Sequence, residues 1–397
     1  MRLFDYAKAS ALMREKGVDI LLASSKHNVG YLADYWHPTS DDYYLLWDTD
    51  ATHKTLAGVP ADEAKGPFLV AGASEQTTIE VLEPWIRDRR YWGPGYYIQT
   101  WADPLDPDPD PGDPMAVAAE ALRERGLDRG TVGIESRYLG LRYAERLREL
   151  LPDARLADAE SILWQLRVVK SGEEVRRTRE ACARTVRAWL ATVRSAREGM
   201  TELEMQRTFA QNCLEEGLEY ERAYVIFGPA GLSLSNGSPP ARGNRLRSGQ
   251  FIRIDAQGRY EGYMCNLSRI VGFGSVTPSM ERAHALERGL LERMVPELGP
   301  GVKCSGLRKI ELRLYPDTGY VPVVPYTGHG VGRVVHEPPY MALNDHTVLE
   351  PGMVVTLEPT ICFSEGGDIF VSMEDQFLIT RDGAEWLTRD APLDLFV

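Results

Sequence analysis

Apolar and polar residues alternate along the first part of the chain in segments of helical and strand length. From Tyr6 to Lys16 the apolar residues recur at helical spacing, and Gly17 ends this pattern before the apolar run at 18–22, which predicts a strand. Further strands are predicted at 42–48, 66–71 and 131–134, and further helices at 74–89 and 115–125. This alternation predicts one α/β domain over residues 1–165.

The remaining residues, 166–397, show longer helical patterns followed by strand-like runs and glycine-rich turns. A charged amphipathic helix is predicted at 173–198, and Thr201 is expected to cap a second helix that continues to Glu216. Strands are predicted at 224–227, 251–254, 353–357 and 369–379, with one further helix at 278–295. This grouping is typical of an α+β domain, and we expect a strongly curved antiparallel sheet.

Length and charge restrict the partners of this chain. The 397 residues fit two domains, and 43% hydrophobic with 26% charged residues is typical of a packed enzyme. The net charge of −13 repels phosphate backbones and anionic lipids, so we expect no nucleic-acid or membrane partner. No apolar run approaches the roughly 20 residues of a membrane span, and the amino terminus lacks a secretory signal, which predicts a cytoplasmic protein.

Two of the seven histidines, His329 and His336, lie in the glycine-rich segment 327–339. Glycines on both sides of His329 permit close approach of the backbone to a site. Taken alone, a histidine between glycines is more typical of a turn than of a ligand. Carboxylates elsewhere in the chain, however, favour the interpretation of His329 as a ligand.

Three carboxylates occur in strand contexts in which burial is costly. Asp255, Glu358 and Glu374 each follow or interrupt an apolar run, and such a carboxylate is costly to bury unless it is paired or bound to a cation. One histidine with several carboxylates is a ligand set for manganese, iron(II), cobalt or zinc, whereas the five cysteines form no CxxC pair. Such a cation activates water for hydrolysis. Buried salt bridges are the alternative interpretation.

The chain resembles the pita-bread metallopeptidase family M24, which includes methionine aminopeptidase, Xaa-Pro aminopeptidase, prolidase and the metal-free creatinase. The matching segments follow the family order and lie at 166–174, 198–204, 329–339, 352–359 and 373–383. The segments 17–22 and 27–32 are similar to the amino-terminal domain of creatinase and prolidase. The resemblance implies an amino-terminal α/β domain, a pita-bread α+β catalytic domain over 166–397, and a homodimer.

The resemblance also implies roles for individual residues. The family's five metal ligands fall on Asp255, Asn266, His329, Glu358 and Glu374, and the eleven-residue step from Asp255 to Asn266 has the family's spacing. In the same resemblance Glu358 shuttles the proton of the attacking water and Glu374 bridges two metals. His336 then contacts the substrate carbonyl and stabilises the oxyanion.

Several positions depart from the family pattern. Asn266 replaces an aspartate, and a neutral amide bridges two cations poorly, so we expect one divalent ion per subunit or a weakly bound second one. No histidine lies about eighteen residues before Asp255, where Asn236 is the closest match and becomes a substrate-binding candidate. Ser372 and Gln257 stand where prolidase-like members carry arginine and glycine. The usual contacts to a proline peptide are therefore in question.

The function implied by the resemblance is a metal-dependent hydrolase of the Xaa-Pro peptidase type, which cleaves an amide C–N bond in a small peptide. The alternative is a creatinase-like enzyme with one metal or none, in which His336 and Glu358 form an acid–base pair acting on a small non-peptide amide. A second alternative is an inactive binding protein. His37 belongs either to a surface aromatic cluster or to an amino-terminal domain that closes the site of a partner subunit.

Overall fold

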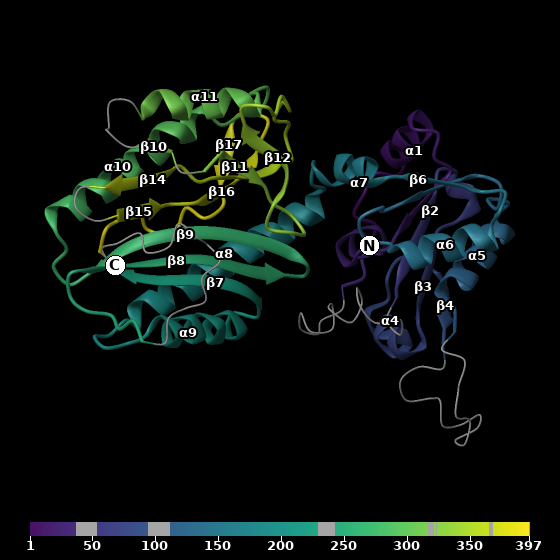
Figure 1. The fold of residues 1–397 in the computed structure, drawn as a ribbon, viewed down its shortest axis with the longest axis horizontal. Coiled ribbons are helices and arrows are strands. Elements are labelled where there is room, and N and C mark those ends of the chain that lie inside the picture. Colours follow the sequence, from purple (N-terminus) through teal and green to yellow (C-terminus); the bar gives the residue numbers. More distant parts are fainter. Residues whose placement is uncertain are drawn as a thin grey trace, which may run out of the picture. The chain divides into compact units, whose positions relative to one another are not determined.

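The structure, a computed structural model, describes residues 1–36, 54–93, 112–228, 243–315, 321–322, 324–364 and 368–396. The chain divides into two compact units, Met1–Arg167 and Val168–Val397 (Figure 1). The strand predicted at 42–48 lies outside the described residues.

The first unit is built on a mixed six-stranded sheet with the order β4-β3-β2-β1-β5-β6. Its strands are β1 (Ile20–Ala23), β2 (Leu56–Pro60), β3 (Phe68–Gly72), β4 (Asp88–Trp92), β5 (Thr131–Ile134) and β6 (Arg155–Asp158). Strands β1, β5 and β6 run parallel, as do β3 and β4, whereas β2 runs antiparallel to both of its neighbours. The prediction of an α/β layer is confirmed, and β5 covers the predicted residues.

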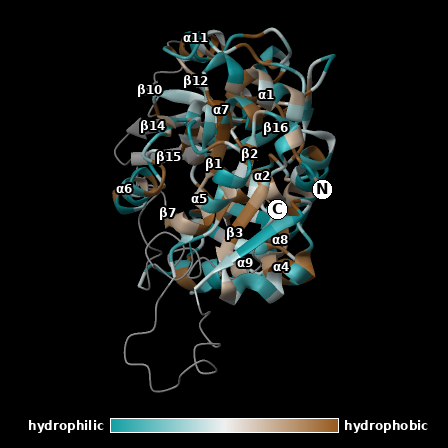
Figure 2. Cartoon of the chain, turned by 90° about the vertical axis from the view of Figure 1, so that its right-hand side faces the viewer, coloured by the Kyte–Doolittle hydropathy of each residue, from teal (hydrophilic) through white to brown (hydrophobic). Residues whose placement is uncertain are grey.

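The helices of this unit are α1 (Tyr6–Glu15), α2 (Lys26–Ala33), α4 (Gln76–Leu82), α5 (Pro114–Glu124), α6 (Leu141–Leu150) and α7 (Glu160–Arg167). The helix predicted at 74–89 is wrong at its end, because α4 stops at Leu82 and Asp88–Trp92 forms a strand. Glu83 has a left-handed φ of 46° and Pro84 follows it, so the helix cannot continue. Figure 2 shows hydrophobic residues along β3, while the helices mix hydrophilic and hydrophobic residues. This distribution is typical of amphipathic helices on a buried sheet.

The described residues of the second unit form three antiparallel sheets instead of one continuous curved sheet. Their orders are β7-β8-β9, β12-β11-β13-β16-β17 and β10-β14-β15. The strands are β7 (Glu219–Gly228), β8 (Gln250–Tyr260), β9 (Tyr263–Phe273), β10 (Val321–Pro322), β11 (Tyr326–Gly330), β12 (Glu337–Ala342), β13 (Val354–Leu357), β14 (Thr360–Ser364), β15 (Asp368–Ser372), β16 (Asp375–Ile379) and β17 (Ala384–Trp386). The run predicted as one strand at 369–379 is interrupted at Met373 and Glu374.

The α-helices in the described part of this unit are α8 (Gly172–Arg194), α9 (Glu202–Glu215), α10 (Pro278–Met294) and α11 (Cys304–Leu314). Ser171 and Thr201 each cap a helix through a reciprocal capping box, which confirms the role predicted for Thr201. Helix α11 was not predicted, because its start has no side-chain cap and Gly306 interrupts its apolar pattern. Figure 1 shows the strands between α8 and α9 on one side and α10 and α11 on the other.

Strand β8 presents two different faces. Ile252, Ile254 and Ala256 pack into the hydrophobic core with α8 and α9, whereas the intervening positions carry polar side chains. The two-residue turn Glu261–Gly262 joins β8 to β9, and both of its residues have positive φ, as a type I′ turn requires. This turn fixes the register of the polar positions on the two strands. No helix in the described part of the chain combines the length and apolar content needed to cross a bilayer.

Candidate metal centre

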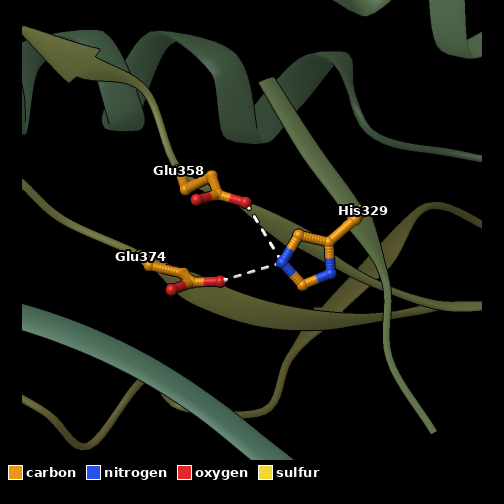
Figure 3. Close-up of side chains that lie close together, drawn as sticks. All are labelled: His329, Glu358 and Glu374. Atoms are coloured by element: carbon orange, nitrogen blue, oxygen red, sulfur yellow. Dashed lines mark ion pairs between the residues drawn. The ribbon is translucent and has the colours of Figure 1, made fainter. Parts of the chain in front are cut away.

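Three predicted site residues, His329, Glu358 and Glu374, meet although they come from different strands. His329 lies on β11, Glu358 directly follows β13, and Glu374 lies between β15 and β16. The His329 Nε2 atom is 3.1 Å from Oε1 of Glu358 and 3.5 Å from Oε1 of Glu374 (Figure 3). All three side chains are buried, and one ligand atom from each lies within 4.8 Å of the others. This spacing allows the three groups to share one cation.

The ring of His329 is oriented by its other nitrogen. Nδ1 lies 2.9 Å from the carbonyl oxygen of Gly330, and donating a proton to this oxygen leaves Nε2 facing the carboxylates. Burial lowers the pKa of His329, but the hydrogen bonds and charges of Glu358 and Glu374 outweigh burial and raise it to about 10. A proton on this imidazole therefore occupies the place between the carboxylates where a divalent cation would bind.

The glycines beside His329 allow β11 to pack closely against its neighbouring strands. A Cβ atom on Gly328 would lie closer than 3.0 Å to the backbone of Thr356, and one on Gly330 would lie closer than 3.0 Å to the carbonyl oxygen of Pro338. The hydroxyl of Thr356 also accepts a hydrogen bond of 3.1 Å from the His329 backbone. Close contact between β11 and its neighbouring strands thus fixes the position of His329.

Replacing Gly328 with alanine should lower the free energy of unfolding by about 1–3 kcal/mol, because the new methyl group pushes against a backbone that cannot rotate away. Manganese affinity should fall with it, since β11 carries His329. Denaturant unfolding and calorimetric titration measure both effects. Gly289→Ala in α10 is the control, because no atom lies within 4 Å of its added Cβ and alanine favours a helix. Equal stability of Gly328→Ala and the wild type would contradict this packing role.

Asp255 and Asn266 lie on the polar face of β8 and β9, next to this cluster. Asp255 is paired with Ser268 across the strands and Gln257 with Asn266, so all four residues share one face. Nδ2 of Asn266 donates a hydrogen bond of 2.5 Å to Oε1 of Glu374. Asp255 is buried, and burial raises its pKa to about 7. Oδ1 of Asp255 and Oδ1 of Asn266 are both buried without a hydrogen-bond partner among the described residues.

Sequence reasoning missed Arg253, which also lies on this face. Its Nη2 atom is 3.1 Å from Oδ2 of Asp255, and both side chains are buried. The two-residue spacing from Arg253 to Asp255 was the available signal, because alternate residues of a strand share a face.

His336 stacks on His329 with ring centroids 3.7 Å apart and an interplanar angle of 17°. Burial and then the charge of His329 lower the pKa of His336 to about 4, so this imidazole is neutral at pH 7. The ring of Tyr326 contacts both histidine rings edge-on, at 6.0 and 6.2 Å. A cavity of about 760 Å³ is lined by Tyr326, Tyr340 and further residues that include 342–346. Tyr326 and Tyr340 were not predicted.

A buried ion pair between Arg269 and Asp375 lies next to the backbone of Glu374. Nη2 of Arg269 is 2.7 Å from Oδ1 of Asp375, and Nη1 of Arg269 donates a hydrogen bond of 3.0 Å to the Glu374 carbonyl. The backbones of Glu374 and Ser268 exchange hydrogen bonds of 3.0 and 3.2 Å. Glu374 is therefore held at the junction of two sheets.

The structure describes two of the four remaining candidate residues. His37 and Asn236 lie outside the described residues. Ser372 is buried, and its carbonyl accepts a hydrogen bond of 3.1 Å from the hydroxyl of Ser268. Gln257 is also buried and pairs with Asn266 in the strand register.

Comparisons with known proteins agree with this architecture. Residues 176–381 match the sequence profile of metallopeptidase family M24, and residues 6–169 match that of the creatinase/prolidase N-terminal domain. YkvY of Bacillus subtilis is 26% identical over 371 residues, which are 93% of this chain and 96% of that protein. A protein of Pyrococcus horikoshii named Xaa-Pro dipeptidase is 27% identical over 260 residues, 65% of this chain and 73% of its own length.

Solved structures show the same fold. The structure of Xaa-Pro dipeptidase from Bacillus anthracis aligns with a TM-score of 0.79 at 19% identity and covers 98% of both chains. The predicted combination of a creatinase-like amino-terminal domain with a pita-bread catalytic domain is thereby confirmed, as is the predicted metallohydrolase class. The chain belongs to metallopeptidase family M24 and carries a creatinase/prolidase domain ahead of its peptidase domain.

Proposed function

We propose that this chain is a metal-dependent hydrolase of the Xaa-Pro dipeptidase type, which cleaves the amide C–N bond of a small peptide. The buried group of His329, Glu358 and Glu374 carries this proposal, because three ionisable side chains within 4.8 Å form a ligand set for a divalent cation. The relative from Pyrococcus horikoshii, named Xaa-Pro dipeptidase, supports the substrate class.

The residues present fit a cation. Besides the buried group, the unpartnered Oδ1 atoms of Asp255 and Asn266 offer two further oxygen ligands within the described residues. His329, Glu358 and Glu374 would hold one ion of manganese, iron(II), cobalt or zinc. When bound, such an ion lowers the pKa of a water molecule and polarises a carbonyl.

The chain's own residues then provide proton transfer and orientation. Glu358 acts as general base and receives the proton of the attacking water. Neutral His336 donates a hydrogen bond to the substrate carbonyl and stabilises the developing oxyanion. The cavity beside Tyr326 and Tyr340 receives a side chain of the peptide. We also propose that two copies of the chain form a homodimer.

The test is hydrolysis of a series of Xaa-Pro dipeptides by protein loaded with manganese, cobalt or zinc, compared with matched Xaa-Ala dipeptides. We expect cleavage that depends on the metal and favours the proline series. Metal content per chain is determined on the same samples by elemental analysis.

Asn266 and Ser372 favour a creatinase-like enzyme as the second candidate, because both depart from the peptidase pattern. In that case the dipeptides stay intact while small non-peptide amides or guanidino compounds are hydrolysed. This result would contradict the dipeptidase proposal.

A further inference from the structure

A cation of the protein itself already lies beside one carboxylate of the candidate metal centre. Arg253 is 4% exposed, and its Nη2 atom is 3.1 Å from Oδ2 of Asp255, which is also 4% exposed. The cross-strand partners of Arg253 are Ile226 and Ile270, so its backbone neighbours supply no carboxylate. The negative charge of Asp255 stabilises the buried guanidinium in this position.

The influence of Arg253 extends beyond Asp255. Its charge is the largest influence that opposes the burial-driven rise in the pKa of Asp255. At Glu374, burial and the charge of Glu358 raise the pKa, and His329 lowers it more strongly than the charge of Arg253 does. The same charge lowers the pKa of Glu287, a buried carboxylate outside the centre, while the ion pair of Arg253 among the described residues is with Asp255.

The charges of the proposed ligands and of Arg253 balance with one divalent ion, although Arg222, which also lowers the pKa of Asp255, is outside this count. Asp255, Glu358 and Glu374 supply three negative charges, His329 is neutral as a ligand, and Asn266 is neutral. Arg253 contributes one positive charge, and one divalent ion contributes the other two. A second divalent ion would leave two positive charges uncompensated in a buried site.

We infer that Arg253 replaces the second metal ion of this centre and limits it to one divalent cation per chain. The guanidinium pairs with Oδ2 of Asp255 and would compete with a second ion for this carboxylate, and Asn266 lacks the negative charge that would attract such an ion. This inference rests on the proposed metal-binding function and adds a determinant of stoichiometry to it. Arg253 is a positioning residue and has no part in the proton transfer.

The test counts manganese per chain by elemental analysis after equilibrium dialysis, with circular dichroism to verify folding. The wild type should bind about one ion, and Asn266→Asp alone should also bind about one, because Arg253 still pairs with Asp255. The double variant Arg253→Met with Asn266→Asp should bind about two, since four carboxylates then face two divalent ions.

Two matched variants separate charge from other effects of the substitution. Arg253→Lys in the Asn266→Asp background keeps the positive charge and should still bind one ion. Arg259→Met in the same background removes another buried arginine of β8, one that pairs with Glu219 at 2.7 Å, and should also bind one.

The outcomes distinguish the inference from the proposed function. Two ions in the wild type or in Asn266→Asp alone would overturn the role of Arg253, and so would a folded double variant with one ion. If Arg253→Met fails to fold, Arg253→Gln in the Asn266→Asp background takes its place and should also bind about two ions. A wild type that binds no ion would overturn the proposed metal-dependent function as well. One ion in the wild type and two in the double variant, without dipeptide hydrolysis, would support the inference and contradict the dipeptidase proposal.

Discussion

Replacing Glu358 with glutamine should lower kcat for Xaa-Pro hydrolysis on the order of 10³-fold, because the amide cannot accept the proton of the attacking water. The same change removes a negative oxygen 3.1 Å from Nε2 of His329, so manganese should bind more weakly. Steady-state kinetics at saturating manganese and calorimetric titration measure the two effects separately. Glutamine has the shape of glutamate, which keeps the buried packing intact.

The matched control for this experiment is Glu350→Gln. Glu350 is exposed and lies ahead of the same strand, β13, so its substitution removes one charge without touching the cluster. Activity and metal affinity should stay at the wild-type level. A Glu358→Gln variant that retains wild-type kcat at saturating manganese would rule out Glu358 as the general base.

Replacing Arg269 with methionine should destabilise the second unit by about 3–5 kcal/mol, because Asp375 is then left as a buried, unpaired charge. Arg269 also donates to the carbonyl of Glu374, so metal affinity should fall as well. Guanidinium chloride unfolding followed by fluorescence measures the first effect, and manganese titration measures the second.

A second substitution separates the buried charge from the lost packing. In Arg269→Met with Asp375→Leu, no unpaired charge remains, so the double variant should be more stable than Arg269→Met alone. Arg288→Met is the control, because its ion pairs with Glu292 and Asp394 lie on the surface and contribute little. A double variant less stable than the single one would show that the pair stabilises the protein through more than charge compensation.

Much of the fold could be predicted from the sequence because local signals were strong. The capping residue Thr201, the helix at 278–295 and the strand at 131–134 each combine a boundary residue with a clear apolar period. The helix at 74–89 was predicted too long because its polar residues also suit the half-buried strand β4. Helix α11 lacks a side-chain cap and was missed for that reason.

The candidate site could be predicted only in part from the sequence. Carboxylates that follow apolar strands indicate buried charge, and His329, Glu358 and Glu374 do meet in the structure. Their roles as metal ligands remain predictions, as does the role of His336. Arg253 was missed because the sequence alone does not give the distance between its guanidinium and the carboxylate of Asp255. Tyr326 was missed for the same reason, because its ring contacts with both histidines are visible only in the structure.

The tight turn at Glu261–Gly262 constrains how this centre can change during evolution. Because side chains alternate across a strand, one residue inserted in the turn would move Asn266 from the polar face into the core behind it. A change of one residue in the length of this turn is therefore costly, whereas exchange of one side chain for another leaves the register intact. The pair of Arg253 and Asn266 is the kind of change that such a hairpin permits.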